Sequence, residues 1–234
     1  METRNLQPLI FARELTRVYA LGEGEVIGIN RICLEIPAGE LVVLKGNSGS
    51  GKSTLLSLLA GLDRPSGGQL IVAGYDLNNV SDAELTCFRR EVIGMVFQSF
   101  NLLPTLSVLE NTCMPALLAG KPLLDTRERA MELLGWLGLK DRLNHLPAQL
   151  SGGEMQRCAI ARALINDPAI ILADEPTGNL DSRNGQSVMT LLAELNRNWK
   201  RTVIIATHSN LADRIASSTI CLKDGMITDH TCDT

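Results

Sequence analysis

The chain has 234 residues, of which 45% are hydrophobic and 21% charged, so it fits one α/β domain with a sizeable core, or two small domains. Its formal net charge of −4 excludes wholesale electrostatic attraction to nucleic acid as the main activity, and we expect no nucleic-acid partner. Polar residues interrupt the longest uncharged stretch (92–109), and the N-terminus lacks the pattern of a secretory signal, so we expect a chain that begins in the cytoplasm and crosses no membrane.

Short apolar runs alternate with helical patterns along the chain. In chain order, the predicted elements are a strand at residues 41–44, a helix at 52–60, strands at 69–73 and 92–97, a helix at 124–139, a helix that runs to residue 164, a strand at 169–173, a helix with Ser182 as its N-cap and a strand at 203–206. The strands at 169–173 and 203–206 are wholly apolar, as in parallel sheets that are buried on both faces. With the helix between them they predict a strand–helix–strand crossover.

Apolar spacing predicts the buried faces of two helices. In the helix at 124–139, Asp125 is expected to act as the N-cap, with Glu128 three residues later. The buried face expected from the i, i+3, i+4, i+7 spacing is Ala130, Leu133, Leu134 and Leu137. The helix after Ser182 repeats this face at Val188, Leu191, Leu192 and Leu195.

The six cysteines and three histidines are dispersed, without the clustered spacing of a zinc site. We therefore expect reduced thiols in a cytosolic protein. The short, mostly polar tail after Ile227, which includes Cys232, is expected to fray.

Residues 46–53, Gly-Asn-Ser-Gly-Ser-Gly-Lys-Ser, fit the pattern G-x-x-x-x-G-K-[ST] between a predicted strand and a predicted helix. The glycines let successive backbone N–H groups point into one concavity, and the helix N-terminus also favours an anion. Lys52 can reach the β- and γ-phosphates of a nucleotide, and the Ser53 hydroxyl can ligate Mg²⁺. A glycine-rich turn is the alternative, but the strand–helix context favours nucleotide binding.

Two other predicted strands end in groups suited to phosphate chemistry. The strand at 169–173 runs into Asp174, which would hold Mg²⁺ through water, and Glu175, which is placed to polarise an attacking water. The strand at 203–206 ends close to His208. Taken singly, two solvated acids and a structural histidine are the simpler interpretations.

Residues 150–157, Leu-Ser-Gly-Gly-Glu-Met-Gln-Arg, discriminate between the classes of nucleotide-binding protein. Ser151 and Glu154 fit a capping box, which opens a helix. A capping box needs no Gly-Gly, however. Gly152 and Gly153 beside a helix N-terminus make a second anion cradle, about a hundred residues from the first.

With this motif the sequence resembles the nucleotide-binding subunits of ABC transporters over nearly its whole length. In the family's order, the matching segments are residues 46–54 for the Walker A loop, Gln98 for the Q-loop, residues 170–175 for Walker B, residues 178–181 for the D-loop and His208 for the switch histidine. The resemblance implies an α/β P-loop NTPase fold of the ABC type, with a mainly parallel central sheet, an antiparallel β subdomain and a helical subdomain. It implies one nucleotide-binding domain over residues 1–234, with a core and β subdomain at about 1–97 and 160–230, and a helical subdomain at about 98–159.

The resemblance also implies the roles of single residues, with ATP and Mg²⁺ as ligands. Glu175 and His208 would be catalytic, and the Mg²⁺ site would comprise Ser53, Gln98 and Asp174. Tyr19 resembles the aromatic residue that stacks on adenine, although a core tyrosine of an edge strand is the alternative. The residues implied to bind ATP are Tyr19, Gly46, Asn47, Ser48, Gly49, Ser50, Gly51, Lys52, Ser53, Thr54, Gln98, Ser151, Gly152, Gly153 and Gln156.

Within the superfamily, residues 96–111 and 174–181 are most similar to ATPases of the lipoprotein-release and macrolide-exporter group (LolD-like and MacB-like). The implied function is ATP hydrolysis that drives export or lipoprotein release. Amino-acid importers and a cell-division ATPase share many of these residues and are alternatives. Asn47, Met155 and Ser209 depart from the usual Pro, Gln and Asp without removing a catalytic atom.

Because each motif occurs once, the resemblance implies a head-to-tail homodimer in the ATP-bound state, with each phosphate loop facing the other copy's Ser-Gly-Gly cradle. It also implies an integral membrane permease that contacts residues 101–110, so the chain would lie peripherally at the cytoplasmic face of the inner membrane. For Glu110, a role in capping or solvating a surface helix is an equal alternative. A soluble, non-transport ABC ATPase is the rival function, but such proteins typically carry two cassettes or a long insertion, and only about fifty residues separate Gln98 from Leu150.

Overall fold

The structure is a computed structural model that describes residues 8–22 and 24–228. Its central sheet has the order β10-β9-β3-β8-β7-β6, and among these described strands β10 alone runs antiparallel to its neighbour. A second, antiparallel sheet has the order β2-β1-β4-β5. The strands are β1 Ile10–Leu21, β2 Gly24–Ile36, β3 Leu41–Lys45, β4 Gly67–Val72, β5 Tyr75–Asp76, β6 Ile93–Phe97, β7 Ile170–Asp174, β8 Thr202–Ala206, β9 Ser218–Lys223 and β10 Met226–Thr228.

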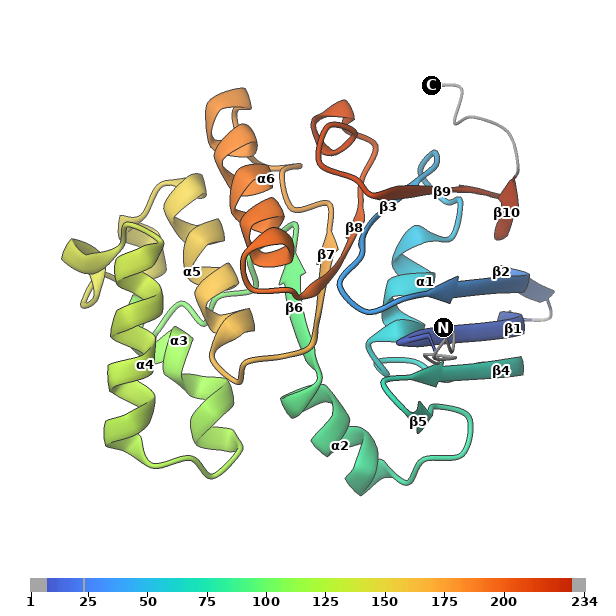
Figure 1. The fold of residues 1–234 in the computed structure, drawn as a ribbon, viewed down its shortest axis with the longest axis horizontal. Helices are drawn as coiled ribbons and strands as arrows, with labels where there is room; N and C mark the ends of the chain where they lie inside the picture. The colour runs from blue at the N-terminus through green and yellow to red at the C-terminus, as the bar shows by residue number, and fades with distance from the viewer. Residues whose placement is uncertain (1–7, 23, 229–234) are drawn as a thin grey trace, which may run out of the picture.

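Helices cover both faces of the central sheet (Figure 1). α1 lies between the central and the antiparallel sheet, and its leucines pack with strands of both. α3, α4 and α5 pack against one another on the side of the molecule opposite β1 and β2, and we term them the helical layer. The helices are α1 Lys52–Leu59, α2 Asp82–Glu91, α3 Val108–Leu118, α4 Leu123–Trp136, α5 Gly152–Leu164 and α6 Ser182–Arg197, and the 3-10 helices are η1 Lys140–Arg142, η2 Pro147–Gln149 and η3 Asn210–Ala212.

The apolar runs form central strands because both faces of each strand are buried. In β8, Val203 and Ile205 join the core under the helical layer and α6, whereas Ile204 and Ala206 join the core around α1. All four side chains are fully buried. This period-two division explains why the run lacks polar residues, and the architecture confirms the predicted α/β fold with its mainly parallel and antiparallel sheets.

The strands β1 and β2, of 12 and 13 residues, carry no clear alternating pattern, and the sequence analysis did not locate them. Their pairing is interrupted by register shifts around Leu15. Glu14 and Arg31 lie in the left-handed region there, with φ of 51° and 52°. Because each bulge exchanges the two faces of a strand, it conceals the period-two pattern that sequence reasoning requires.

α4 confirms the buried face predicted for it but not its predicted cap. The helix begins at Leu123 after Pro122, and no side chain caps it, so Asp125 lies inside the first turn and the N-cap prediction is wrong. Proline presets the backbone dihedral for the entry into a helix. The face that is at most 3% exposed is Ala130, Leu133, Leu134 and Leu137.

α6 is capped by Asp181 and not, as predicted, by Ser182. The Asp181 carboxylate accepts a hydrogen bond from the backbone N–H of Asn184 at 2.9 Å, which satisfies one of the free donors of the first turn. On the predicted face of this helix Leu191 is half-buried, and the fully buried members are Val188, Leu192 and Leu195.

The two tryptophans of the chain pack against each other. Trp136 ends α4, Trp199 follows α6, and their ring centroids are 4.9 Å apart. The Arg129 guanidinium lies 5.8 Å from the Trp199 ring centroid. This aromatic pair joins the helical layer to the end of α6.

Four cysteines, Cys33, Cys87, Cys113 and Cys158, are free thiols, as predicted. The prediction of reduced thiols is wrong at Cys221, which forms a disulfide bond. Cys232, and with it the tail predicted to fray, lies outside the described residues beyond position 228. No helix within the described residues has the length and apolar character that a membrane span requires.

We predict that Leu172→Ala in β7 lowers the free energy of unfolding by about 2–5 kcal/mol, because the side chain is completely buried and leaves a cavity. Leu124→Ala is the control: that side chain is 75% exposed, and its loss should change stability by no more than about 0.5 kcal/mol. Urea unfolding followed by circular dichroism measures both values. Equal effects would contradict the burial of β7.

Candidate functional site

The loop between β3 and α1 folds around its own lysine. Lys52 is 7% exposed, and its ammonium donates to the backbone carbonyls of Gly46 at 2.7 Å and Asn47 at 3.1 Å. Gly46, with φ of 149°, approaches β9 so closely that a Cβ atom would lie 2.2 Å from the Leu222 carbonyl oxygen. Only glycine fits this position. The loop therefore holds a buried cation beside the N-terminus of α1, which is the arrangement predicted for a phosphate site.

Beside this loop lies a cavity of about 750 Å³. Most of the residues predicted to bind nucleotide line it, although they come from distant parts of the chain. The lining also includes Val26, Ile27 and Gly28 of β2, which the sequence analysis missed because this bulged strand was not located. The full lining is Tyr19, Val26, Ile27, Gly28, Asn47, Ser48, Gly49, Gly51, Lys52, Ser53, Thr54, Gln98, Glu175 and His208.

Tyr19 is held in the wall of this cavity by a charged pair. Its hydroxyl donates to the Asp63 carboxylate at 2.8 Å, and Arg17 binds the same carboxylate oxygen at 2.7 Å. The Arg17 guanidinium also lies 4.5 Å from the centre of the Tyr19 ring. The ring is thus fixed beside the exposed side chains of Val26 and Ile27, a place suited to a flat aromatic ligand. This position favours the predicted ligand contact over a core tyrosine.

Oxygen atoms gather next to Lys52. The Ser53 hydroxyl donates to the Asp174 carboxylate at 3.1 Å, which joins the start of α1 to the end of β7. Burial raises the pKa of Asp174, and Glu175 raises it further, whereas the Ser53 hydrogen bond and Lys52 oppose this effect. Gln98 lines the same cavity. A hydroxyl, a carboxylate and an amide oxygen are the donors that a hard cation prefers, so these residues fit Mg²⁺.

Glu175 is held in one orientation by the end of β8. Its two carboxylate oxygens contact His208 Nδ1 at 2.9 Å and the Thr207 hydroxyl, which donates at 3.1 Å. Its backbone, at φ of 44°, donates to the Ala206 carbonyl at 2.8 Å. The Glu175 side chain is 17% exposed and His208 is 73% exposed, so the carboxylate is sheltered while the imidazole faces outward.

Gln98 directly follows β6 and is tied to the segment after β7. The Asn179 side-chain amide donates to the Gln98 carbonyl at 3.0 Å, and Gln98 Nε2 lies 3.5 Å from Asn179 Oδ1. A Cβ atom on Gly178 would lie 2.6 Å from Gln98 Nε2, so a glycine there lets the two segments approach. Asn179 and Thr207 are contacts that the sequence analysis missed, because each is visible only once the strands lie side by side.

The residues of the 150–157 motif lie apart from this cavity, since none of them is among its lining residues in the described chain. The predicted capping box is present: the Ser151 hydroxyl accepts from the Glu154 N–H at 3.3 Å and opens α5. Gly152 packs near Leu180, in the segment after β7. Gln156 is fully buried, and its amide donates to the Pro176 carbonyl at 2.7 Å.

Comparison with known proteins identifies related chains. The family profile described as "ABC transporter" matches residues 29–178. An uncharacterized ABC transporter ATP-binding protein of Methanocaldococcus jannaschii is 46% identical over 94% of this chain and 98% of its own. The macrolide export ATP-binding/permease protein MacB of Burkholderia cenocepacia is 47% identical over 94% of this chain but only 32% of its own length.

A solved structure shows the same fold. The ATP-binding cassette MJ0796, as a dimer in a post-hydrolysis state bound to ADP and Pi, superimposes with a TM-score of 0.87. It is 42% identical to this chain and covers 93% of it, and the match includes 96% of the solved chain.

We predict that Gly28→Ala weakens nucleotide binding by roughly ten- to a hundredfold, because overpacking of this kind costs about 1–3 kcal/mol. The added Cβ would lie 2.8 Å from the Tyr19 ring and 2.9 Å from the Thr54 methyl group, so both must move out of the cavity wall. Gly24→Ala, on the same strand, is the control because its nearest atom is 3.7 Å away. Titration with a fluorescent nucleotide analogue measures both; equal affinities would contradict the placement of the ligand against β2.

Proposed function

Since this chain belongs to the ABC transporter family, as one of its ATP-binding subunits, we propose that the cavity beside Lys52 binds ATP and that Glu175 is the base for its hydrolysis. The single observation that supports this most strongly is the position of Glu175 next to Asp174 at the end of β7, held by His208 and Thr207. Tyr19 would stack on the adenine, and the loop at 46–54 would surround the phosphates.

Glu175 would take a proton from the water that attacks the γ-phosphate, and His208 and Thr207 would keep its carboxylate in place. Lys52 would stabilise negative charge on the phosphates during the transfer. Ser53, Asp174 and Gln98 would hold Mg²⁺. When bound, that ion neutralises phosphate charge as a Lewis acid.

We further propose a head-to-tail homodimer in the ATP-bound state. Two observations support it: the motif at Ser151 does not line the chain's own cavity, and the similar cassette MJ0796 is a dimer. The Ser151–Gly153 cradle of one copy would close on the γ-phosphate held by the other copy. Gln156 was predicted to bind ATP, but its side chain is fully buried and donates to the Pro176 carbonyl, so it would support the cradle from the buried side of α5. Hydrolysis would then remove contacts that exist only in the closed pair.

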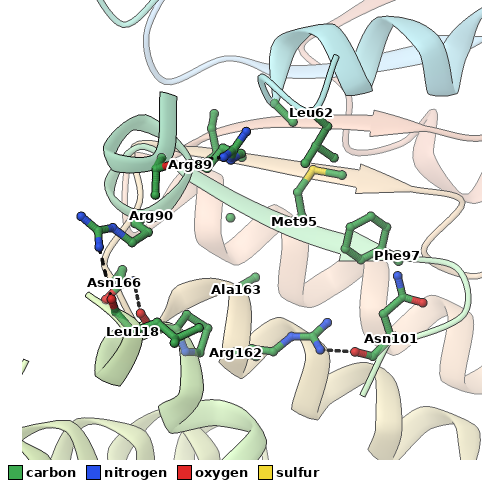
Figure 2. A pocket seen from close by; sticks show the side chains of 15 residues that line it. Leu62, Arg89, Arg90, Met95, Phe97, Asn101, Leu118, Arg162, Ala163 and Asn166 are labelled. Carbon is green, nitrogen blue, oxygen red and sulfur yellow. Dashed lines mark hydrogen bonds between the residues drawn. The ribbon is translucent and has the colours of Figure 1, made fainter. Parts of the chain in front are cut away.

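A groove of about 620 Å³ is the proposed contact site for a membrane permease. It lies between α2, β6 and the ends of α3 and α5, and its walls are mostly apolar (Figure 2). Asn101, from the segment predicted to face the permease, lies in the groove, and the Arg162 guanidinium donates to its backbone carbonyl. The groove is therefore tied to the chain that leaves Gln98.

The groove is basic as well as apolar. Arg89, Arg90 and Arg162 line it, and within the described residues each donates to backbone carbonyls without pairing with a carboxylate. The buried atoms Arg90 Nε and Asn166 Oδ1 have no hydrogen-bond partner there. These features favour a permease segment with an apolar face and an acidic side chain.

Glu110 does not line this groove; it takes part in the capping box that opens α3. Its carboxylate accepts from the Ser107 N–H at 2.8 Å and from the Ser107 hydroxyl at 2.6 Å, in the capping box of α3. This favours the alternative of a helix cap over a permease contact for Glu110.

ATP hydrolysis would drive export or lipoprotein release at the cytoplasmic face of the inner membrane, and the likeness to MacB, which is named a macrolide export protein, supports export. This chain spans about a third of the length of MacB, whose name includes a permease, and we propose that a permease supplies the membrane part of the transporter. Importers of amino acids and cell-division complexes stay alternative assignments, because their ATPases share these motifs.

The expected behaviour of Glu175→Gln tests the hydrolytic mechanism and the dimer together. The change removes the base, which costs about 10²–10⁴-fold in rate, but keeps the contacts to nucleotide. The variant should therefore accumulate as an ATP-dependent dimer, whereas the wild type, which clears its nucleotide, should run mostly as a monomer. Light scattering after size exclusion, with and without ATP, measures the mass.

A second change provides the control. Ser151→Phe in the Glu175→Gln chain should abolish the dimer, because the bulky side chain fills the cradle, while one ATP per monomer still binds. A Glu175→Gln protein that binds ATP and stays monomeric at micromolar concentration would refute the proposed dimer.

For the groove, we expect the Arg90→Glu variant to lose its binding to the permease, since the reversed charge repels an acidic side chain of the partner. Tagged chains expressed in the source cells and purified in detergent should recover an integral membrane protein with the wild type but not with Arg90→Glu. Arg129→Glu, an exposed reversal on α4 outside the groove, should retain it. Recovery of the same membrane protein by Arg90→Glu at wild-type yield would remove the groove from the proposal.

A further inference from the structure

The carboxylate of Glu154 links Ser151, in the 150–157 motif, to Arg142, which lies nine residues before Ser151. One oxygen, Oε2, accepts from the Ser151 N–H at 2.9 Å and from the Ser151 hydroxyl at 2.8 Å. The other, Oε1, accepts from Arg142 Nε at 2.9 Å. Arg142 ends η1, and its second nitrogen lies 3.4 Å from His145 Nε2. The hydroxyl of Ser151 is therefore oriented by Glu154, and Glu154 by Arg142.

Glu154 is a charged neighbour of the cradle. The Ser151 N–H, Arg142 and the Ser151 hydroxyl, in that order, lower the pKa of Glu154 to about 2, so it is ionised at neutral pH. Its side chain is 19% exposed, which limits screening by water. An anion at this position repels a phosphate that approaches Ser151, unless a cation balances it.

Two other capping boxes in the described part of the chain also pair a serine with a glutamate. Ser81 with Glu84 opens α2, and Ser107 with Glu110 opens α3, with the same pair of reciprocal hydrogen bonds. Within residues 8–22 and 24–228, neither of these glutamates forms an ion pair or hydrogen bond with an arginine, although the charge of Arg127, after the Ser107 hydrogen bonds, lowers the pKa of Glu110. Formation of a capping box therefore needs no such pair, and the arginine occurs at the box that Gly152 and Gly153 leave open to a ligand.

We propose that Arg142 is a positioning residue of the composite ATP site: it balances the charge of Glu154 and fixes the Ser151 hydroxyl so that the cradle accepts the γ-phosphate held by a second copy. This inference rests on the proposed dimer. Arg142 belongs to η1, outside the 150–157 motif, so η1 would take part in closing the dimer. The hydroxyl proton that Ser151 donates to Glu154 is turned to a phosphate oxygen on closure, and Arg142 then keeps Glu154 from drawing it back.

The test is a double-mutant cycle in the Glu175→Gln chain, read as the dissociation constant of the ATP-dependent dimer by analytical ultracentrifugation. Arg142→Gln should raise this constant roughly tenfold or more, because it leaves the Glu154 charge facing the phosphate. In a chain that also carries Glu154→Gln there is no charge to balance, so adding Arg142→Gln should have less than about a threefold effect. Arg129→Gln, which breaks the exposed pair with Glu132, should leave the constant unchanged.

Two further readouts separate positioning from folding. The ATP affinity of the monomer should be the same for Arg142→Gln and its parent, since Lys52 and its loop are untouched, and the melting temperature should fall by only a few degrees through loss of the Arg142–Glu154 pair. An equal weakening by Arg142→Gln with and without Glu154→Gln would mean a merely structural role and would overturn the inference, as would a dimer of unchanged strength. If the parent Glu175→Gln chain binds ATP without forming any dimer, the proposed function fails first, and this inference fails with it.

Discussion

The arrangement of the site depends on one constraint: an apolar sheet, buried on both faces, whose parallel strands all end at the same edge. β3 delivers the loop of Lys52 there, β6 delivers Gln98, β7 delivers Asp174 and Glu175, and β8 delivers His208. In β3, β6, β7 and β8 the polar side chains are confined to the strand ends, so the chemistry lies at the last residue of a strand or in the loop that follows it. Because ladder hydrogen bonds fix the register, Phe97 and Asp174 are paired although far apart in sequence, and the side chains at this edge need few contacts of their own to stay aligned.

The same edge explains how the groove and the site are connected. The helical layer is formed by the part of the chain between β6 and β7. This segment leaves the sheet at Gln98, whose carbonyl accepts a hydrogen bond from Asn179. Arg162 of α5 holds the Phe100 carbonyl at 2.8 Å, so the segment after Gln98 is clamped to the helical layer at one end and to the site at the other. The permease segment proposed for the groove and the nucleotide proposed for the cavity would therefore bear on one short length of backbone, which is the physical requirement for coupling between them.

Sequence reasoning found those parts of the molecule whose signal is local. A few consecutive residues are enough to identify each of these: the loop of Lys52, the carboxylates at the end of β7, the capping box of Ser151 and the apolar strands. It missed β1 and β2, whose bulges hide the alternation, and with them the wall formed by Gly28. It also missed the contacts of Asn179 with Gln98 and of Thr207 with Glu175, because these partners are close only after the sheet has formed. The cap predicted at Asp125 failed because Pro122 starts that helix earlier, a preference that competes with side-chain capping.

The pairing of Trp136 with Trp199 has a practical consequence for the dynamics of this fold. Since the chain contains no other tryptophan, all of its indole emission arises at the single joint between the helical layer and the end of α6. Rings 4.9 Å apart exchange excitation, and this exchange changes steeply with their separation. The tryptophan fluorescence of the unlabelled protein therefore reports changes in the position of the helical layer relative to the end of α6.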